Sequence, residues 1–140
     1  MSIRVLQEHV LSQRRFAVLG ASRDPENAGY RVYETLKSAG YVTYAINPNY
    51  DEVAGDICYP RLDNVPGPID CVVTVTGPET TEDAMRAAGH LKIPFVWMQP
   101  GSESTAAYNL AISFAMQIVS GGPCIIDAIK HRTTLVATAA

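Results

Sequence analysis

The chain has 140 residues, which is long enough for one domain with a substantial core and too short for a nucleotide domain plus a separate catalytic domain. Hydrophobic residues make up 47% and charged residues 18%, and the formal net charge of −3 gives no electrostatic reason to expect nucleic-acid binding. Apolar runs are too short to span a bilayer, and three cysteines without CxxC spacing indicate neither a disulfide framework nor a structural zinc site. We therefore expect a cytoplasmic, single-domain protein with reduced thiols and neither a membrane segment nor a metal site.

The first half of the chain alternates between helical and extended patterns. Residues 2–15 have apolar residues at helical spacing, and the short apolar run over 16–19 predicts a buried strand. A second helical pattern covers residues 29–39 and stops at Gly40, a residue that commonly ends a helix. The apolar run over 42–46 then predicts another buried strand.

The second half of the chain repeats this alternation and ends in a short tail. Strands are expected over 71–75, 95–98 and 117–119. Helices are expected from Thr80 or Thr81, from Ser102 or Ser104, and over 124–130. We expect the tail over residues 133–140 to be frayed. Because strands alternate with helices, right-handed crossovers predict an α/β fold with a doubly wound parallel sheet of about five strands and helices on both faces.

Ligands of such sheets bind outside the carboxyl ends of the strands, so the residues that follow each predicted strand are candidates for a site. The first strand is followed by Gly20-Ala21-Ser22-Arg23. Small residues let a ligand approach the backbone, and the Ser22 hydroxyl and the Arg23 guanidinium can both bind phosphate oxygens. The alternative is that Ser22 only caps a turn and that Arg23 is a solvated surface charge.

The second strand ends without the acidic residue of a usual dinucleotide site. An acidic side chain at that place binds the ribose hydroxyls, whereas this chain has Asn47-Pro48, and Asp51 and Glu52 follow only after the proline has turned the chain. The sequence therefore disfavours a nicotinamide cofactor. The Asn47 amide either contacts an adenosine or forms an Asn-Pro turn.

The later strand ends carry few reactive side chains. Pro78 is either a rigid surface under an adenine ring or part of an ordinary strand-to-helix loop, and Trp97 and Met98 are expected in the core. No group of His, Asp and Ser or Cys gathers at the predicted strand ends, so the sequence predicts no catalytic residues. The nearest candidates are Asp127 and Cys124, which lies beside Gly-Gly-Pro at 121–123.

The strand ends taken together resemble those of a known family. The segments VLGASRDP, INPNY, VVTVTGPE, VWMQPGSES and SGGPC follow one another within about residues 14–132. They are similar to segments of the small coenzyme A-binding proteins, whose single Rossmann-like domain resembles the N-terminal domain of the succinyl-CoA synthetase α subunit. The resemblance implies that coenzyme A or an acyl-CoA binds across the strand ends. By this resemblance, the phosphates would contact Gly20, Ala21, Ser22 and Arg23. The adenosine 3′-phosphate side would contact Asn47, Pro48, Asn49 and Tyr50. The adenine would contact Val75, Thr76, Gly77 and Pro78.

The chain departs from the pattern of these proteins at two places and lacks a match to the second domain of the synthetase. Its segment GGPCIID at 121–127 differs from the acidic C-terminal motif of many small relatives. A lysine often follows the proline of the second-strand loop, and Asn49 stands there in this chain, which leaves the 3′-phosphate to Arg23 or Arg31 or makes the contact weaker. The phosphorylated histidine of the synthetase belongs to that second domain, so the first hypothesis is a CoA-binding module without catalysis of its own.

Two other hypotheses remain open. One is an enzyme, either a nicotinamide-dependent oxidoreductase or the CoA-handling subunit of a multi-chain acyl-CoA ligase. The other is a protective mixed disulfide between Cys124 and the thiol of coenzyme A. Besides coenzyme A or an acyl-CoA, a protein partner or a homo-oligomer is left open.

Overall fold

The computed structural model describes residues 2–139, and it describes side chains for residues 2–132. Its elements, in chain order, are α1 (Ile3–Leu11), β1 (Arg15–Leu19), α2 (Ala28–Ser38), β2 (Val42–Ile46), β3 (Glu52–Val53), β4 (Asp56–Tyr59), the 3₁₀ turn η1 (Leu62–Asn64), β5 (Cys71–Thr74), α3 (Pro78–His90), β6 (Phe95–Met98), α4 (Thr105–Ser113), β7 (Gln117–Val119) and α5 (Ile125–Ala139). The alternation of strands and helices that the sequence predicts is therefore present.

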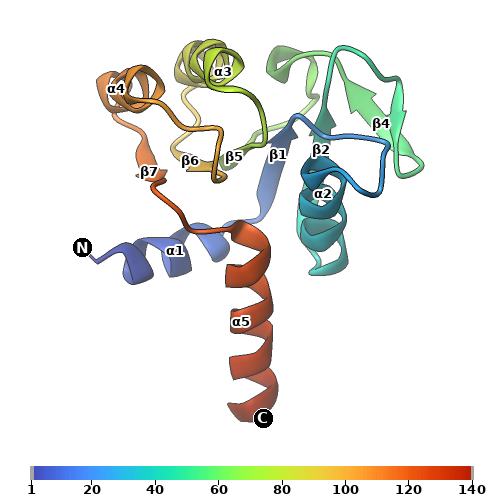
Figure 1. Ribbon diagram of the computed structural model, residues 1–140, viewed down its shortest axis with the longest axis vertical. Helices are drawn as coiled ribbons and strands as arrows, with labels where there is room; N and C mark the ends of the chain where they lie inside the picture. Colours follow the sequence, from blue (N-terminus) through green and yellow to red (C-terminus); the bar gives the residue numbers. More distant parts are fainter. Residues whose placement is uncertain (1, 140) are drawn as a thin grey trace.

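The strands form one sheet in the order β3-β4-β2-β1-β5-β6-β7 (Figure 1). All neighbouring pairs are parallel except β3 with β4, so the predicted doubly wound, Rossmann-like α/β fold is confirmed. Strand order reverses between β1 and β5, because one crossover from β1 leads to β2 and the later crossovers lead the other way. A ligand site is expected at the carboxyl side of this switch point.

The sheet has seven strands rather than about five, because the hairpin of β3 and β4 is absent from the sequence-based prediction. These strands are two and four residues long and include the charged residues Glu52 and Asp56. Strands of this kind lack the continuous apolar run by which the buried strands are recognised. The hairpin matters for the site, because η1 follows it directly.

Helices cover both faces of the sheet. Phe16 and Val18 of β1 point to the face that packs against α1, α2 and α5, whereas Ala17 and Leu19 point to the face that packs against α3 and α4 (Figure 1). The two core clusters alternate along β1 because successive strand residues face opposite sides. Trp97 and Met98 are fully buried, as predicted.

Several helix ends differ from their predicted places. The first helix ends at Leu11, four residues before its predicted end at residue 15. The third helix begins at Pro78 with Gly77 as its N-cap, because a proline at the first helical position needs no hydrogen-bonding partner for its nitrogen, and Thr80 and Thr81 lie inside the helix. Of the two serines considered for α4, Ser104 is the N-cap, and its hydroxyl accepts from the Ala107 amide at 3.0 Å.

The last helix runs over Ile125–Ala139 and is longer than the predicted segment over 124–130. The predicted fraying over residues 133–140 is not tested, because these residues lie outside the part of the chain whose side chains are described. Among the described residues, no helix combines the length and the apolar character that crossing a membrane requires.

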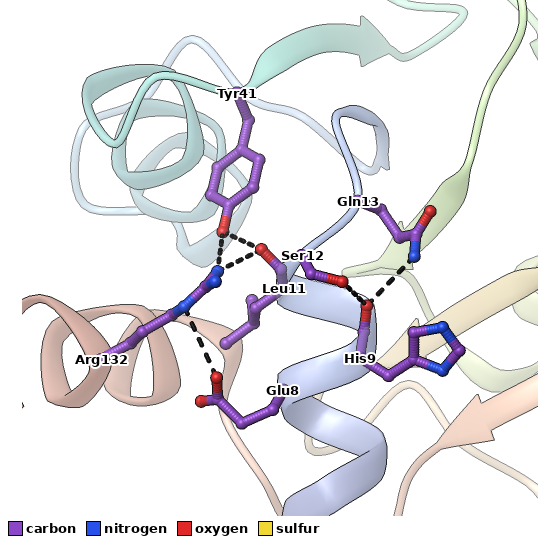
Figure 2. Close-up of polar contacts among 7 residues, drawn as sticks. All are labelled: Glu8, His9, Leu11, Ser12, Gln13, Tyr41 and Arg132. Atoms are coloured by element: carbon purple, nitrogen blue, oxygen red, sulfur yellow. Dashed lines mark hydrogen bonds and ion pairs between the residues drawn. The ribbon is translucent and has the colours of Figure 1, made fainter.

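A polar cluster fastens α5 to α1 at the amino ends of the strands (Figure 2). The Arg132 guanidinium donates to the Leu11 carbonyl oxygen and, at 3.1 Å, to the Tyr41 hydroxyl. The Tyr41 hydroxyl donates to the same carbonyl at 2.6 Å, and Glu8 lies 3.5 Å from the Arg132 Nε. Burial raises the pKa of Tyr41 although Arg132 opposes the shift, so the phenol stays protonated and keeps its donor.

Candidate functional site

The turn after β1 is formed by two close approaches between backbone segments. Gly20 has a φ of +89°, and a Cβ at this position would lie 2.4 Å from the Val75 carbonyl oxygen at the end of β5. A Cβ at Gly29, in the first turn of α2, would lie 1.9 Å from the Gly20 carbonyl oxygen. Glycine is therefore required at both positions, and Gly29 allows the close packing of helix on turn that a later glycine of the dinucleotide fingerprint allows.

The rest of this turn separates a buried serine from an exposed arginine. Ser22 is 5% exposed, and its Oγ accepts a hydrogen bond from the Asp24 amide at 3.1 Å. The Ser22 oxygen therefore caps the turn, as one of the two interpretations predicts. The Arg23 guanidinium carbon lies 5.8 Å from the centre of the Tyr50 ring. No carboxylate pairs with Arg23 within the part of the chain whose side chains are described, so its charge is available to an anion.

Asn47 joins the loops after β1 and β2. Its Nδ2 donates to the Ala21 carbonyl oxygen at 2.9 Å, and its Oδ1 accepts from the Asn49 amide at 2.9 Å. Of the two interpretations of Asn47, the structure therefore has the turn, because the side chain is already committed to the backbone at both ends. Asn47 acts on the site by holding the two loops at a fixed separation.

The loop after β5 is held by backbone contacts and by two threonines. The Val75 amide donates to the Leu19 carbonyl oxygen at 2.8 Å, and the Thr76 and Thr81 hydroxyl oxygens lie 2.7 Å apart. Gly77 and Pro78 are exposed and start α3. Gly77 therefore ends the strand-to-helix connection, and Pro78 is the first residue of the helix.

A cleft of about 850 Å³ opens beside these loops on the α3 face of the sheet. This volume is in the range of pockets that hold cofactors. Five residues that the sequence predicts for the site line this cleft, namely Gly20, Asn47, Pro48, Asn49 and Thr76. The other predicted site residues lie outside its lining, namely Ala21, Ser22, Arg23, Tyr50, Val75, Gly77 and Pro78.

The opposite wall of the cleft is absent from the sequence-based prediction. It consists of residues after β4, of one face of α3 and of the C-cap residue of this helix. These residues are Pro60, Arg61, Leu62, Asp63, Thr80, Asp83, Ala84, Ala87, His90 and Leu91. The α3 members recur at intervals of three and four residues, the spacing of one helix face. That spacing is visible in the sequence, but only the strand order shows that this face lies opposite the end of β2.

The ends of β6 and β7 are tied to the start of α5. Gln99 is 6% exposed, and its Oε1 accepts from the Ile125 amide at 2.7 Å, while the Trp97 indole donates to the Pro123 carbonyl oxygen at 3.0 Å. The Gln99 Nε2 lies 3.4 Å from the Cys124 Sγ. These side chains fix the loop between β7 and α5.

The three cysteines are free thiols in different surroundings. Cys58 and Cys71 are buried, and burial raises the pKa of both thiols, so they are protonated and unreactive at neutral pH. Cys124 is partly exposed and lines a hollow between α2 and α5, across the sheet from the cleft. Among the described residues, no three His, Cys, Asp or Glu side chains are placed to hold a metal ion.

Comparison with known proteins gives matches over most of the chain. Residues 14–128 match the family described as the CoA binding domain. The α subunit of the ADP-forming acetate–CoA ligase II of Pyrococcus furiosus is 30% identical over 94% of this chain and 31% of its own length. The chain thus spans about a third of that subunit.

Two solved structures show the same fold at different total lengths. A hypothetical protein from Pyrococcus horikoshii has a TM-score of 0.87 and 27% identity, covering 96% of this chain and 93% of that one. The dinucleotide-forming acetyl-coenzyme A synthetase 1 of Ca. Korarchaeum cryptofilum has a TM-score of 0.70 and 26% identity, covering 79% of this chain and 26% of that one. The similarity therefore extends both to a protein of comparable size and to one part of a larger enzyme.

Proposed function

The chain belongs to the CoA-binding domain family, and on this premise we propose that it binds coenzyme A or an acyl-CoA at the carboxyl ends of its parallel strands. The observation that carries the proposal is the position of the 850 Å³ cleft, which adjoins the glycine turn after β1 at the switch point of the sheet. Open α/β sheets bind nucleotides at this place.

The adenosine of the ligand fits the cleft by its chemistry. The walls bring together apolar side chains from both sides, among them Leu19, Ile46, Leu62 and Ala84, which suit the faces of a purine ring. Polar groups at the rim, such as Asn49 and Thr80, can bind its edge and the ribose. We place the adenosine here, against the end of β2 and the side of α3.

The phosphates belong, in this proposal, at the turn formed by Gly20, Ala21, Ser22 and Arg23. Gly20 has no side chain, so a phosphate can approach the backbone of the turn. The hydroxyl proton of Ser22 is available to a phosphate oxygen, because Ser22 uses only its Oγ, as an acceptor, within the described part of the chain. The unpaired Arg23 supplies the positive charge. Its stacking near Tyr50 holds the guanidinium between the loops after β1 and β2.

We propose that binding is the whole activity of this chain in isolation and that a partner supplies any chemistry. Support comes from the ligase α subunit of Pyrococcus furiosus, about a third of which this chain matches. The second candidate function is therefore that of a CoA-handling subunit in a multi-chain acyl-CoA ligase. The three free cysteines fit a reducing compartment, and we propose the cytosol as the location.

Calorimetric titration of the protein with coenzyme A, dephospho-CoA, NAD and ATP tests the binding proposal. We expect coenzyme A to bind more tightly than NAD, because Asn47 stands where a nicotinamide site has its acidic residue. Weaker binding of dephospho-CoA would assign a contact to the 3′-phosphate. Tight binding of NAD with no heat from coenzyme A contradicts the proposal.

A pair of helix variants tests the location of the adenosine. Ala87 is partly buried in the cleft, so Ala87→Phe should fill it and weaken coenzyme A binding by at least tenfold. Ala106→Phe places the same side chain on the exposed side of α4, outside the cleft, and should leave the affinity unchanged. Equal affinities for the two variants would place the adenosine elsewhere.

Isolation of the tagged chain from its own cells separates the two candidate roles. Copurification of an ATP-binding chain, with acyl-CoA formation by the mixture from acid, ATP and coenzyme A, supports the ligase-subunit role. Recovery of the chain without such a partner, but with full affinity for coenzyme A, favours the role of an independent binding protein.

A further inference from the structure

The two edges of the sheet are protected to different degrees. The β3 edge is two residues long, contains the exposed Glu52, and pairs antiparallel with β4 only. The β7 edge pairs only with β6, and residues 116–119 read Met-Gln-Ile-Val, without charge or proline. Short strands, charged side chains and proline are the usual means by which an edge is kept from pairing with another chain. The β7 edge has a short length but neither of the other two protections.

The backbone of β7 presents a self-complementary pair of groups. The Gln117 amide donates to the Pro94 carbonyl oxygen at 2.8 Å and so faces β6. Since the hydrogen-bonding side alternates along a strand, the N–H and C=O of Ile118 point away from β6. In an antiparallel pair, two directly opposed residues can exchange both of these hydrogen bonds. Ile118 could therefore pair with Ile118 of a second copy across a two-fold axis.

Helix α1 extends beyond the sheet at this same edge. Ile3, Leu6 and Val10 form one stripe at helical spacing, and Val10 is fully buried while Ile3 is 49% exposed. Figure 1 shows the first turn of α1 reaching past β7, and the helix contacts this strand. Val5, in the same turn, is 53% exposed. The apolar stripe therefore continues past the last strand, to where a neighbouring sheet would lie.

We propose that two copies of this chain associate through β7 in an antiparallel, two-fold arrangement, so that their sheets become continuous and the first turn of each α1 covers the other copy. A two-fold interface needs only one surface that complements itself, as the outward groups of Ile118 do. A standard interface takes about 800 Å² from each partner, which is about a tenth of the 7380 Å² that the chain exposes.

The charge distribution is compatible with this contact. Each copy has a formal net charge of −3, but β7 is uncharged, and so is the whole of α4, Thr105–Ser113, which contacts β7 on the other face of the sheet. Repulsion between two negatively charged copies is therefore not concentrated at the edge. Tyr108 and Ile112 of α4 are 43% and 53% exposed and add apolar surface to the same helix.

Sedimentation velocity on the full chain tests the proposal, first with the unmodified protein at about 50 µM. The chain mass is 15.1 kDa, and we expect a species of twice this mass that dissociates on dilution. Hydrogen exchange should show the Ile118 amide protected at high protein concentration and exchanging rapidly when diluted. A 15.1 kDa species at every concentration overturns the proposal.

Matched lysine substitutions at the two edges make the test specific. Ile3→Lys changes an exposed residue of the overhanging turn, so it should yield a folded monomer; Gln117→Lys, on the edge strand itself, should do the same. Ile57→Lys changes an isoleucine on β4 near the opposite edge that is more exposed than Ile3, 66% against 49%, and this variant should remain dimeric. If the two β7-side variants stay dimeric, or if only Ile57→Lys dissociates, the interface is wrong.

Titration with coenzyme A separates this proposal from the proposed function. The β7 edge is on the other side of β6 and β5 from the cleft, so the monomeric variants should keep the affinity of the unmodified protein. A dimer without affinity for coenzyme A overturns the proposed function alone, and a monomer with normal affinity overturns the dimer alone.

Discussion

The two ends of the parallel strands are held together in different ways. At the carboxyl ends, backbone segments touch at Gly20 and Gly29 and the neutral Asn47 joins two loops. At the amino ends, charged side chains bind the backbone: Asp70 accepts from two amides, and Arg132 donates to the end of α1. Arg23 remains unpaired among the described residues of the carboxyl ends. The comparison indicates that charged side chains fasten the backbone at the amino ends, whereas at the glycine turn of the carboxyl ends Arg23 has no carboxylate partner among the described residues.

The largest loss of stability is expected from adding one methyl group at Gly29, beside the turn at the carboxyl ends of the strands. Gly29→Ala puts a Cβ 1.9 Å from the Gly20 carbonyl oxygen, and both groups are part of the backbone, so α2 or the turn must move. We expect a loss of about 3 kcal/mol in the free energy of unfolding, measured by urea denaturation, together with weaker coenzyme A binding.

Gly67→Ala is the matched control for this substitution. The nearest atoms to a Cβ at Gly67 are side-chain atoms at 3.5 Å and 3.7 Å, which is ordinary contact. Its unfolding free energy should change by less than about 0.5 kcal/mol. Similar losses for both variants would mean that the approach of α2 to the turn does not require glycine.

A smaller effect is expected from a substitution at the amino ends of the strands, which should lower stability and leave coenzyme A binding unchanged. The Asp70 carboxylate accepts from the Arg14 and Arg15 amides at 3.1 Å and 2.9 Å. Asp70→Ala leaves both donors without this acceptor and should cost about 2 kcal/mol of unfolding free energy, while the calorimetric affinity for coenzyme A stays within about twofold. Asp70→Asn keeps an acceptor oxygen and should cost less. A large loss of affinity in the Ala variant would contradict the separation of the two ends.

The opposite result is expected for Arg23, where a substitution should lower coenzyme A affinity and leave stability unchanged. Its guanidinium pairs with no carboxylate among the described residues, so Arg23→Ala should leave the unfolding free energy unchanged to within about 0.5 kcal/mol. Coenzyme A affinity should fall about tenfold, or about 1.4 kcal/mol, and the loss should shrink at high salt. Arg4→Ala, an exposed cation on α1, is the control and should bind normally. An Arg23 variant with normal affinity would remove the phosphate contact from the proposal.

The smallest effect is a pH dependence at the amino end of β4. Hydrogen bonds from Lys37 and Tyr33 lower the pKa of Asp56 below its usual 3.8. Because the folded pKa is below the unfolded one, the stabilisation is present above about pH 4 and is lost as the pH falls through the folded value.

Denaturation of the unmodified protein and of Asp56→Asn at two pH values measures this stabilisation. The two free energies of unfolding should differ more at pH 7 than at pH 3, and by less than about 1 kcal/mol because Asp56 and Lys37 are partly exposed. A difference that grows toward acid pH would have the wrong sign.

The sequence predicts the central part of the fold well because buried parallel strands are continuous apolar runs. β2, β6 and β7 have their predicted bounds, whereas the short hairpin of β3 and β4 has no such run and therefore gives no signal in the sequence. The predicted start of α3 at Thr80 or Thr81 is wrong, because threonine is a common N-cap, whereas the helix has Gly77 as its N-cap and Pro78 as its first residue.

The candidate site could be predicted only in part. Each strand end is visible in the sequence, so the sequence predicts Gly20, Asn47 and Thr76 as site residues, and all three line the cleft. The role of Asn47 stayed open between ligand and turn, because its bond to the Ala21 carbonyl joins residues 26 positions apart. The wall formed by η1 and α3 depends on strand order, which residue spacing does not determine.

The bonds of Asn47 have a consequence for the thermodynamics of binding. Its amide holds the loop after β1 against the loop after β2. Ordering a flexible loop on binding costs conformational entropy, and here that ordering takes place during folding. Under the proposed function the site is therefore preorganised, and the association rate of coenzyme A should reflect diffusion into an open cleft rather than a slow loop closure.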